Sequence, residues 1–319
     1  MNRDQLISHY DEVMGTAHGY PDIDAYVARR ETLYRRYCIG KSRAEEALVW
    51  MKLLSDDFGR DIANLGCYLA LREDDASIFH RALNTASVWG QLTMASGVCD
   101  HSLYAWTVLP LVLSARRFDD IEKMLPIQNG LSKNGLTSSV CIVNLVMLLF
   151  YREPAWEKPV LVSAKKVLQK RCTLEEKAAI GCLLALVDGD WGRFSSCLSD
   201  VSAAKRRSRE YGENAFTRQV SYMAMGLYAL AHHVRGDEMP ISDALRDDAV
   251  FRLIDSDLGD GAKIRFHVFD DPPGLLNMMK MMERPAMFLA DGSKQVLDIE
   301  RYRNEIVALG WVGRLAFRR

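Results

Sequence analysis

The sequence has none of the local motifs that usually mark an enzyme active site. It contains no GxGxxG or P-loop glycine motif, no HExxH zinc motif and no GxSxG nucleophile motif. Nucleotide binding, zinc-dependent hydrolysis and α/β-hydrolase chemistry therefore lack their usual signatures. We predict a protein without catalytic residues and without a cofactor.

Cysteine and histidine are too scattered to predict a metal site. The seven cysteines include no CxxC pair, and no cluster of histidines completes a ligand set. An odd number of widely spaced cysteines is typical of buried thiols in a reducing compartment. His232 and His233 are adjacent, but consecutive helical residues diverge by about 100°. We interpret this pair as structural and predict no metal.

The chain also lacks a charge excess and a membrane-spanning run. Its 41 Lys and Arg residues against 42 Asp and Glu residues give a net charge of -1, which supplies no overall field for nucleic acid or an anionic membrane. The most apolar stretch, residues 140–151, is shorter than the roughly 20 residues that cross a bilayer. The first residues lack the apolar core of a secretory signal. We predict a cytoplasmic protein that binds neither nucleic acid nor membrane.

Helix signals are abundant in the first 240 residues. Ser42 with Glu45, and Thr173 with Glu176, have the spacing of a capping box, in which hydroxyl and carboxylate satisfy the backbone donors of a helix start. Each precedes an apolar run. Glycines such as Gly189 fall between these runs, where a positive φ is easily adopted.

Three of the breaks between helices share one register. Segments starting at Leu71, Leu113 and Leu186 each end an apolar helix with a leucine, cross a polar turn and begin a second helix. The second helix is apolar at the sixth, ninth and thirteenth positions, which are Ala76, Phe79 and Leu83; Phe118, Ile121 and Leu125; and Trp191, Phe194 and Leu198. A weaker copy begins at Leu149, so successive copies start 42, 36 and 37 residues apart.

This spacing predicts an all-α protein of stacked antiparallel helix pairs, a TPR-like helical repeat or α-solenoid. A two-helix unit cannot bury both of its apolar stripes alone, so neighbouring units stack and share one elongated core. Residues 1–240 would form this helical-repeat domain. Because the copies are divergent, an irregular helical bundle stays open as the alternative.

The character of the sequence changes after about Pro240. Residues 263–269 alternate polar and apolar side chains as a short strand does, and Asp291–Gly292 lies between two apolar runs as in a hairpin. We therefore expect residues 241–319 to be a C-terminal extension, packed on the same body, that combines helix with a small β element.

Charge is uneven locally although the total is balanced. A basic run from Lys205 to Arg209 precedes an acidic stretch, and such runs are usually solvated surface. The functional alternative is that the acidic stretch captures a basic protein surface, because complementary potentials speed association. The candidate partner-binding residues are Asp243, Asp247, Asp248, Asp255, Asp257 and Asp260.

The second half of the chain resembles the immunity protein 49 family. The resemblance runs from Leu183 to Pro240 and rests on three motifs in order: an aspartate turn leading into a helix, a basic and aromatic segment, and an apolar helix that ends before an acidic stretch with a proline. The matching residues are Asp190, Phe194 and Leu198, then Lys205 and Tyr211, then Ala231, Gly236 and Pro240. The chain departs from the family in its longer N-terminal region and in His232–His233.

The resemblance implies a non-enzymatic immunity protein. Such a protein binds and neutralises a cognate polymorphic toxin, delivered by a contact-dependent or type VI secretion pathway, through direct protein–protein contact. The family has no catalytic residues to transfer. Two other functions stay open: a helical-repeat adaptor or regulator without a toxin partner, and an all-α enzyme, which would need a concave pocket with perturbed titratable groups.

Overall fold

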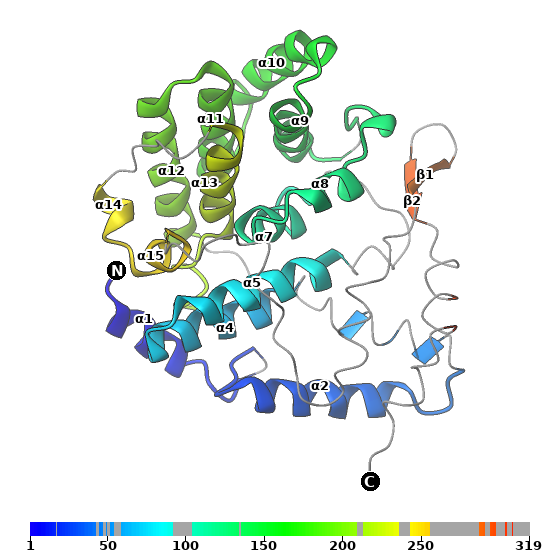
Figure 1. The fold of residues 1–319 in the computed structure, drawn as a ribbon, viewed down its shortest axis with the longest axis vertical. Helices are drawn as coiled ribbons and strands as arrows, with labels where there is room; N and C mark the ends of the chain where they lie inside the picture. Colours follow the sequence, from blue (N-terminus) through cyan, green and yellow to red (C-terminus); the bar gives the residue numbers. More distant parts are fainter. Residues whose placement is uncertain are drawn as a thin grey trace.

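In the computed structural model of this chain, the described residues form a stack of helices (Figure 1). The described residues are 1–42, 59–91, 104–208, 213–235 and 243–255, apart from positions 17 and 134, together with 45–46, 49, 52–53, 287–290, 294–297, 304 and 308.

The first part of the stack contains helices of unequal length. They are Arg3–Asp11 (α1), Ile23–Tyr37 (α2), Arg60–Glu73 (α4), Ala76–Gln91 (α5), Val108–Ser114 (α7) and Asp119–Met124 (α8), followed by the 3₁₀ turn Ile127–Asn129 (η3). The later helices are Thr137–Tyr151 (α9), Pro154–Leu168 (α10), Leu174–Asp188 (α11), Trp191–Arg206 (α12), Tyr222–Arg235 (α13), Asp243–Arg246 (α14) and Ala249–Asp255 (α15).

The helix starts form as the sequence predicts. The Thr173 backbone N–H donates to Glu176 Oε2 at 2.6 Å, and the Glu176 N–H donates to Thr173 Oγ1 at 3.1 Å, which completes a capping box. Gly189 has a φ of 72° and ends α11, while Asp190 Oδ1 accepts the Arg193 N–H and caps α12. Sequence and local structure agree at this turn.

The repeated register corresponds to buried positions in three helix pairs. All three leading leucines are buried, and so are the ninth and thirteenth positions of each copy. The sixth positions are only half-buried, because the first turn of the second helix lies at the edge of the core. These buried residues are Leu71, Phe79 and Leu83; Leu113, Ile121 and Leu125; and Leu186, Phe194 and Leu198.

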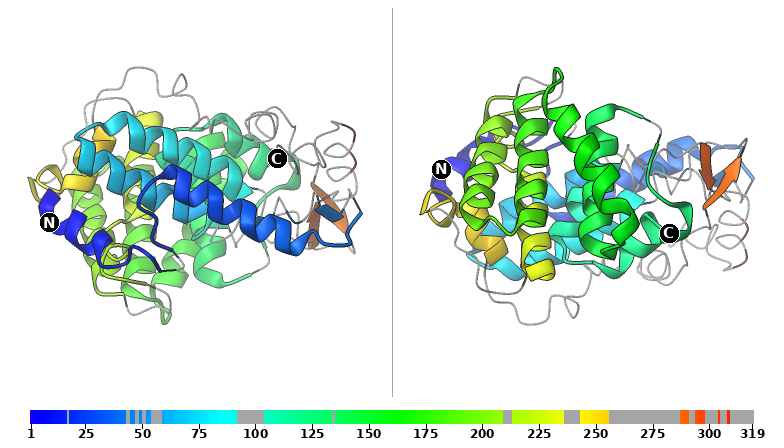
Figure 2. Two further views of the ribbon diagram at one scale, coloured as in Figure 1. Left: turned by 90° about the horizontal axis from the view of Figure 1, so that it is seen from below. Right: turned by 90° about the horizontal axis from the view of Figure 1, so that it is seen from above.

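The helices stack in an order that sequence neighbours alone do not give. Helix α4 packs on α5, α5 on α7, α7 on α13, α13 on α11 and α12, α11 on α9, and α9 on α10. In Figure 1, α2 lies at one end of this stack and α10 at the other, and Figure 2 shows the same helices from above and below. The fold class is therefore all-α, with stacked antiparallel helix pairs.

Two glycines let neighbouring helices approach closely. A Cβ on Gly66 of α4 would lie 2.0 Å from the Ala82 side chain of α5. A Cβ on Gly226 of α13 would lie 2.9 Å from the Pro110 carbonyl oxygen of α7. A larger residue at either place would force the two helices apart, so these glycines fix the spacing of the stack.

The C-terminal part is described only in pieces. Helix α15 packs on α4 and α5, so residues 249–255 lie against the stack. Met287–Ala290 (β1) and Lys294–Leu297 (β2) pair antiparallel, with Ala290 opposite Lys294, which confirms the predicted hairpin. The strand predicted at 263–269 lies outside the described residues. The division at residue 240 stays a prediction.

Within the described residues, none of the helices is both long and apolar enough to span a membrane.

Candidate functional site: a polar cavity around His18 and Asp61

A cavity of about 240 Å³ opens between the N-terminal segment, the first turns of α4, the start of α7 and the segment leading into α13. Its walls combine charged, amide and aromatic side chains. The lining residues include His18, Arg60, Asp61, Asn64, Trp106 and Tyr222.

The first turn of α4 supplies one wall of the cavity. Asp61 and Asn64 lie three residues apart and therefore on the same face of the helix. Gly59 precedes them with a φ of 81°, and a Cβ there would lie 2.6 Å from the Ala86 carbonyl oxygen. A glycine is needed at this helix start for both reasons, backbone conformation and close approach.

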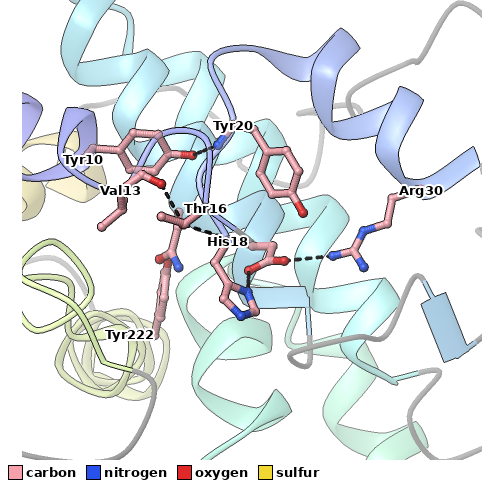
Figure 3. Close-up of polar contacts among 9 residues, drawn as sticks. Tyr10, Val13, Thr16, His18, Tyr20, Arg30 and Tyr222 are labelled. Atoms are coloured by element: carbon pink, nitrogen blue, oxygen red, sulfur yellow. Dashed lines mark hydrogen bonds and ion pairs between the residues drawn. The ribbon is translucent and has the colours of Figure 1, made fainter. Parts of the chain in front are cut away.

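Asp61 is the buried centre of the site. It is 2% exposed, and one of its oxygens accepts from Arg30 Nη2 at 2.9 Å. Its other oxygen lies 3.1 Å from His18 Nδ1. Dashed lines in Figure 3 lead from this carboxylate to His18 and to Arg30, which come from the loop after α1 and from α2. The carboxylate thereby holds the N-terminal segment against α4.

The contact with Asp61 orients the His18 ring. A carboxylate can only accept from a ring nitrogen, so Nδ1 carries the hydrogen and Nε2 carries the lone pair when the ring is neutral. The His18 side chain is 58% exposed, whereas Asp61 beneath it is buried. The pair is a base with its orienting group, which is two of the three members of a nucleophilic triad.

The opposite wall is aromatic. Tyr222 at the start of α13 donates its hydroxyl to Asn64 Oδ1 at 2.7 Å. Tyr10 accepts the Tyr20 backbone N–H at 3.3 Å, and its ring meets Phe216 edge-on with a centroid distance of 4.9 Å. Burial raises the pKa of Tyr10 far above its usual value, so this phenol stays neutral. These rings form a rigid wall.

The remaining charged groups of the cavity are engaged within the protein. Lys205 of α12 pairs with Glu213, and Arg60 donates from Nη2 to the Trp106 carbonyl oxygen at 2.7 Å. The cavity therefore combines both signs of charge and is shaped for a polar group rather than for an aliphatic one. Among the described residues, no group of three or more His, Cys, Asp and Glu side chains could hold a metal ion.

The predicted acidic stretch does not form one exposed surface. Asp248 is 4% exposed and faces inward. Its Oδ2 accepts from Arg206 Nη2 of α12 at 2.5 Å, and its Oδ1 accepts the Val250 N–H at the start of α15. Asp248 is a buried structural group, which corrects its assignment to a partner-binding surface.

The other members of the stretch have different surroundings. Asp247 is exposed after α14, and Asp243 is the first residue of that helix. Asp255 is exposed as a residue, but its Oδ1 accepts the Tyr228 hydroxyl at 2.5 Å. Asp257 and Asp260 lie outside the described residues. A partner-binding role for Asp243, Asp247, Asp255, Asp257 and Asp260 stays a prediction.

Sequence reasoning overlooked a basic surface on α10. Residues 152–171 contain six Lys or Arg residues and two Glu residues, a net charge of +4. Lys158, Lys165 and Lys166 are exposed on the outer side of α10, and Val162 between them is 45% exposed. The basic residues could have been found in the sequence as a charge run, but they are spread over residues 152–171 and are less closely spaced than those at 205–209.

The histidine pair at 232–233 packs on aromatic rings. His233 is exposed and stacks on Phe118 with a centroid distance of 3.9 Å, and His232 is half-buried with its ring edge-on to Tyr228. Burial and the nearby Arg152 lower the pKa of His233. The two rings contact different partners, as expected for neighbours on a helix.

Comparisons with known proteins found no match: no family model, no curated protein and no solved structure is similar to this chain. The resemblance to the immunity protein 49 family therefore stays a prediction from the motifs named above.

Proposed function

We propose that this chain is a non-enzymatic protein-binding protein, and specifically a cytoplasmic immunity protein that binds and neutralises a cognate secreted bacterial toxin. The observation that carries the binding function is the exposed basic face of α10 at the end of the helix stack. The identity of the partner as a toxin is supported by the sequence resemblance.

Helix α10 has two distinct faces. Val160, Ala164 and Val167 are buried, on a helix that packs against α9 and α11. Lys158 and Lys165, seven residues apart, share the opposite side with Val162. In Figure 1, α10 lies at the outer end of the stack. A helix with this pattern presents one polar face to whatever approaches the end of the stack.

The chemistry of this face fits an acidic protein surface. No described residue forms an ion pair with Lys158, Lys165 or Lys166. Val162, which is 45% exposed, adds apolar area between the charges. Ammonium groups around exposed aliphatic side chains match a partner that presents carboxylates around an apolar centre. Nucleic acid binding usually adds aromatic stacking groups to such a patch.

The residues of the resemblance have clear roles in the helix framework. Asp190 caps α12, and Phe194 and Leu198 on that helix are buried. Lys205 pairs with Glu213 beside the cavity. These roles support a stable helical body from which a partner is bound, as in other stacked-helix proteins.

The proposal predicts that a toxin gene lies beside the gene of this chain, and co-expression of the two proteins tests it. We expect survival of the producing cells and co-purification of the two proteins. Replacing Lys158, Lys165 and Lys166 together by Glu should slow association at low salt by about tenfold or more, because rim charges act mainly on the encounter rate. Surface plasmon resonance against salt concentration measures this.

The matched control reverses three charges elsewhere. Arg29, Arg35 and Arg36 are exposed on α2, and their replacement by Glu should leave association within about twofold. Equal association rates for the α10 variant and the wild type would show that the basic face of α10 does not bind the partner. Co-purification without protection would favour the adaptor function. If the α10 variant loses only the ability to bind DNA, the basic face of α10 is a nucleic acid binding surface instead.

A further inference from the structure

Two cysteines face each other across the α11–α12 pair. Cys182 is seven residues before Gly189, at which α11 ends, and Cys197 is seven residues after Asp190, which caps α12. An antiparallel hairpin places residues equally far from its turn opposite one another. Cys182 Sγ lies 3.9 Å from the Phe194 carbonyl oxygen, one turn before Cys197. Both thiols therefore lie in the same layer of this interface.

A glycine makes room for the second thiol. A Cβ on Gly181 would lie 2.9 Å from Cys197 Sγ, so the thiol of α12 rests against the α11 backbone next to Cys182. Each thiol also influences the pKa of the other, as expected of close neighbours.

The two thiols differ in reactivity. Cys182 is buried, and burial followed by its contact with Cys197 raises its pKa well above the usual value. Cys197 is half-buried. The neighbouring Cys182 thiol, together with the charge of Arg193 one turn earlier, lowers the pKa of Cys197 to about 7 against the opposing effect of burial. About half of Cys197 is then thiolate at neutral pH.

Three other cysteines lack this activation. Burial raises the pKa of the half-buried Cys38 and of the buried Cys67. Burial also raises the pKa of Cys141 to about 12. Since the thiolate is the nucleophile, these three thiols are disfavoured in reactions with oxidants.

We propose that Cys197 is an oxidant-sensitive modification site and that Cys182 is its resolving partner. With a hydroperoxide as oxidant, the Cys197 thiolate attacks one peroxide oxygen, the O–O bond breaks, and Cys197 sulfenic acid and hydroxide form. The Cys182 thiol then attacks the sulfenic sulfur. An S–S bond forms, the S–O bond breaks and water leaves, so two thiols are oxidised as the peroxide is reduced. A thiol reductant reverses the reaction. This site is independent of the function proposed above.

Peptide mass spectrometry tests the proposal on the full chain. Trypsin cleaves after Lys177, Arg193 and Lys205, so Cys182 and Cys197 fall on separate peptides, residues 178–193 and 194–205. After limited treatment with hydrogen peroxide and alkylation of the remaining thiols, we expect these two peptides to appear linked. Dithiothreitol should restore the separate peptides. During the peroxide treatment, the fraction of Cys197 that can still be alkylated should fall at least about fivefold faster than that of Cys38. The reason is that more of Cys197 than of Cys38 is thiolate at pH 7.

Variants separate the two steps. In Cys182→Ser, the sulfenic acid at Cys197 should persist and be trapped by dimedone. In Cys197→Ser, Cys182 should stay reduced under the same treatment. Arg193→Gln removes a tryptic site and leaves both cysteines on one peptide, residues 178–205. In this variant the disulfide should appear as an unalkylated 178–205 peptide that forms more slowly than the linkage in wild type. The proposal is overturned if the linked peptides are absent from oxidised wild type, or if Cys38 is oxidised as fast as Cys197.

Discussion

The helix pairs α4–α5 and α11–α12 follow the same sequence register but are held in the fold differently. Both bury a leading leucine and the ninth and thirteenth positions of the copy, which are Phe79 and Leu83 in one pair and Phe194 and Leu198 in the other. The shared pattern therefore specifies the packing within each pair. It does not specify how a pair attaches to the rest of the molecule.

The attachment of α4–α5 is polar. Asp61 binds Arg30 of α2, Asn64 accepts from Tyr222 of α13, and His80 Nε2 lies 2.8 Å from the Leu253 carbonyl oxygen of α15. These buried groups tie one pair to three other helices. Each contact has a directional requirement, so the polar groups favour one arrangement of the stack.

The α11–α12 interface is mainly apolar, with the two thiols of Cys182 and Cys197 within it. Neither helix has a buried charged side chain. Its specificity comes from shape, such as the room that Gly181 leaves for Cys197. The attachment of α4–α5 to other helices thus relies on buried polar contacts, whereas the interface within α11–α12 relies on close packing.

The largest expected effects test what the pairs have in common. Phe79→Ala and Phe194→Ala should each lower the free energy of unfolding by about 3–5 kcal/mol, because each removes a fully buried aromatic ring and leaves a cavity. Urea denaturation of both variants measures this. A loss below about 1 kcal/mol at one position would mean that the two copies are not structurally equivalent.

The next effect should separate the two pairs. Asp61→Asn leaves the buried Arg30 guanidinium without its counter-charge and should cost about 3 kcal/mol. His18→Ala keeps the Arg30 pair and should cost less than about 1 kcal/mol, since His18 is largely exposed. Asp188→Asn breaks an exposed pair on α11 and should be near neutral. Equal shifts of the denaturation midpoint in Asp61→Asn and Asp188→Asn would contradict this difference between the two helix pairs.

The sequence was informative where the interaction is local. The capping box at Thr173 and Glu176, the turn at Gly189 and the hairpin at 287–297 each depend on residues close in the chain, and each forms as expected. The repeated register also predicted the all-α fold class, because a helix pair is a local unit.

The cavity was not accessible to the same reasoning. Asp61 meets Arg30 and His18 across separations of 31 and 43 residues, and neither spacing belongs to a known motif. The prediction that Asp248 binds a partner was wrong for the same reason, because its ion-pair partner Arg206 is 42 residues away. A charge run in sequence cannot show which carboxylate turns inward, because this depends on the packing of distant helices.

Smaller effects are expected from substitutions in the turn that the two helix pairs share. Asp75 accepts the Ser77 N–H at 2.8 Å at the start of α5, and Asp190 accepts the Arg193 N–H at 3.0 Å at the start of α12. Asp75→Ala and Asp190→Ala should each cost about 1 kcal/mol at pH 7, as loss of a helix cap usually does. Equal losses of unfolding free energy in the two variants would show that the two aspartates play the same capping role although the surrounding contacts differ.

The pH dependence sharpens this prediction for α5. The hydrogen bonds from Ser77 lower the pKa of Asp75, so its contribution to stability is complete above the unfolded-state pKa and is lost as pH falls through the lower, folded-state pKa. The difference between wild type and Asp75→Ala should therefore shrink as the pH falls below about 4, the ordinary pKa of an aspartate. Asp75→Asn retains a capping oxygen without a titrating group, and its stability difference from Asp75→Ala should stay constant over the same range. Denaturation curves at pH 7, 4 and 2.5 measure both, and a pH-independent difference between wild type and Asp75→Ala would show that the cap does not depend on the carboxylate charge.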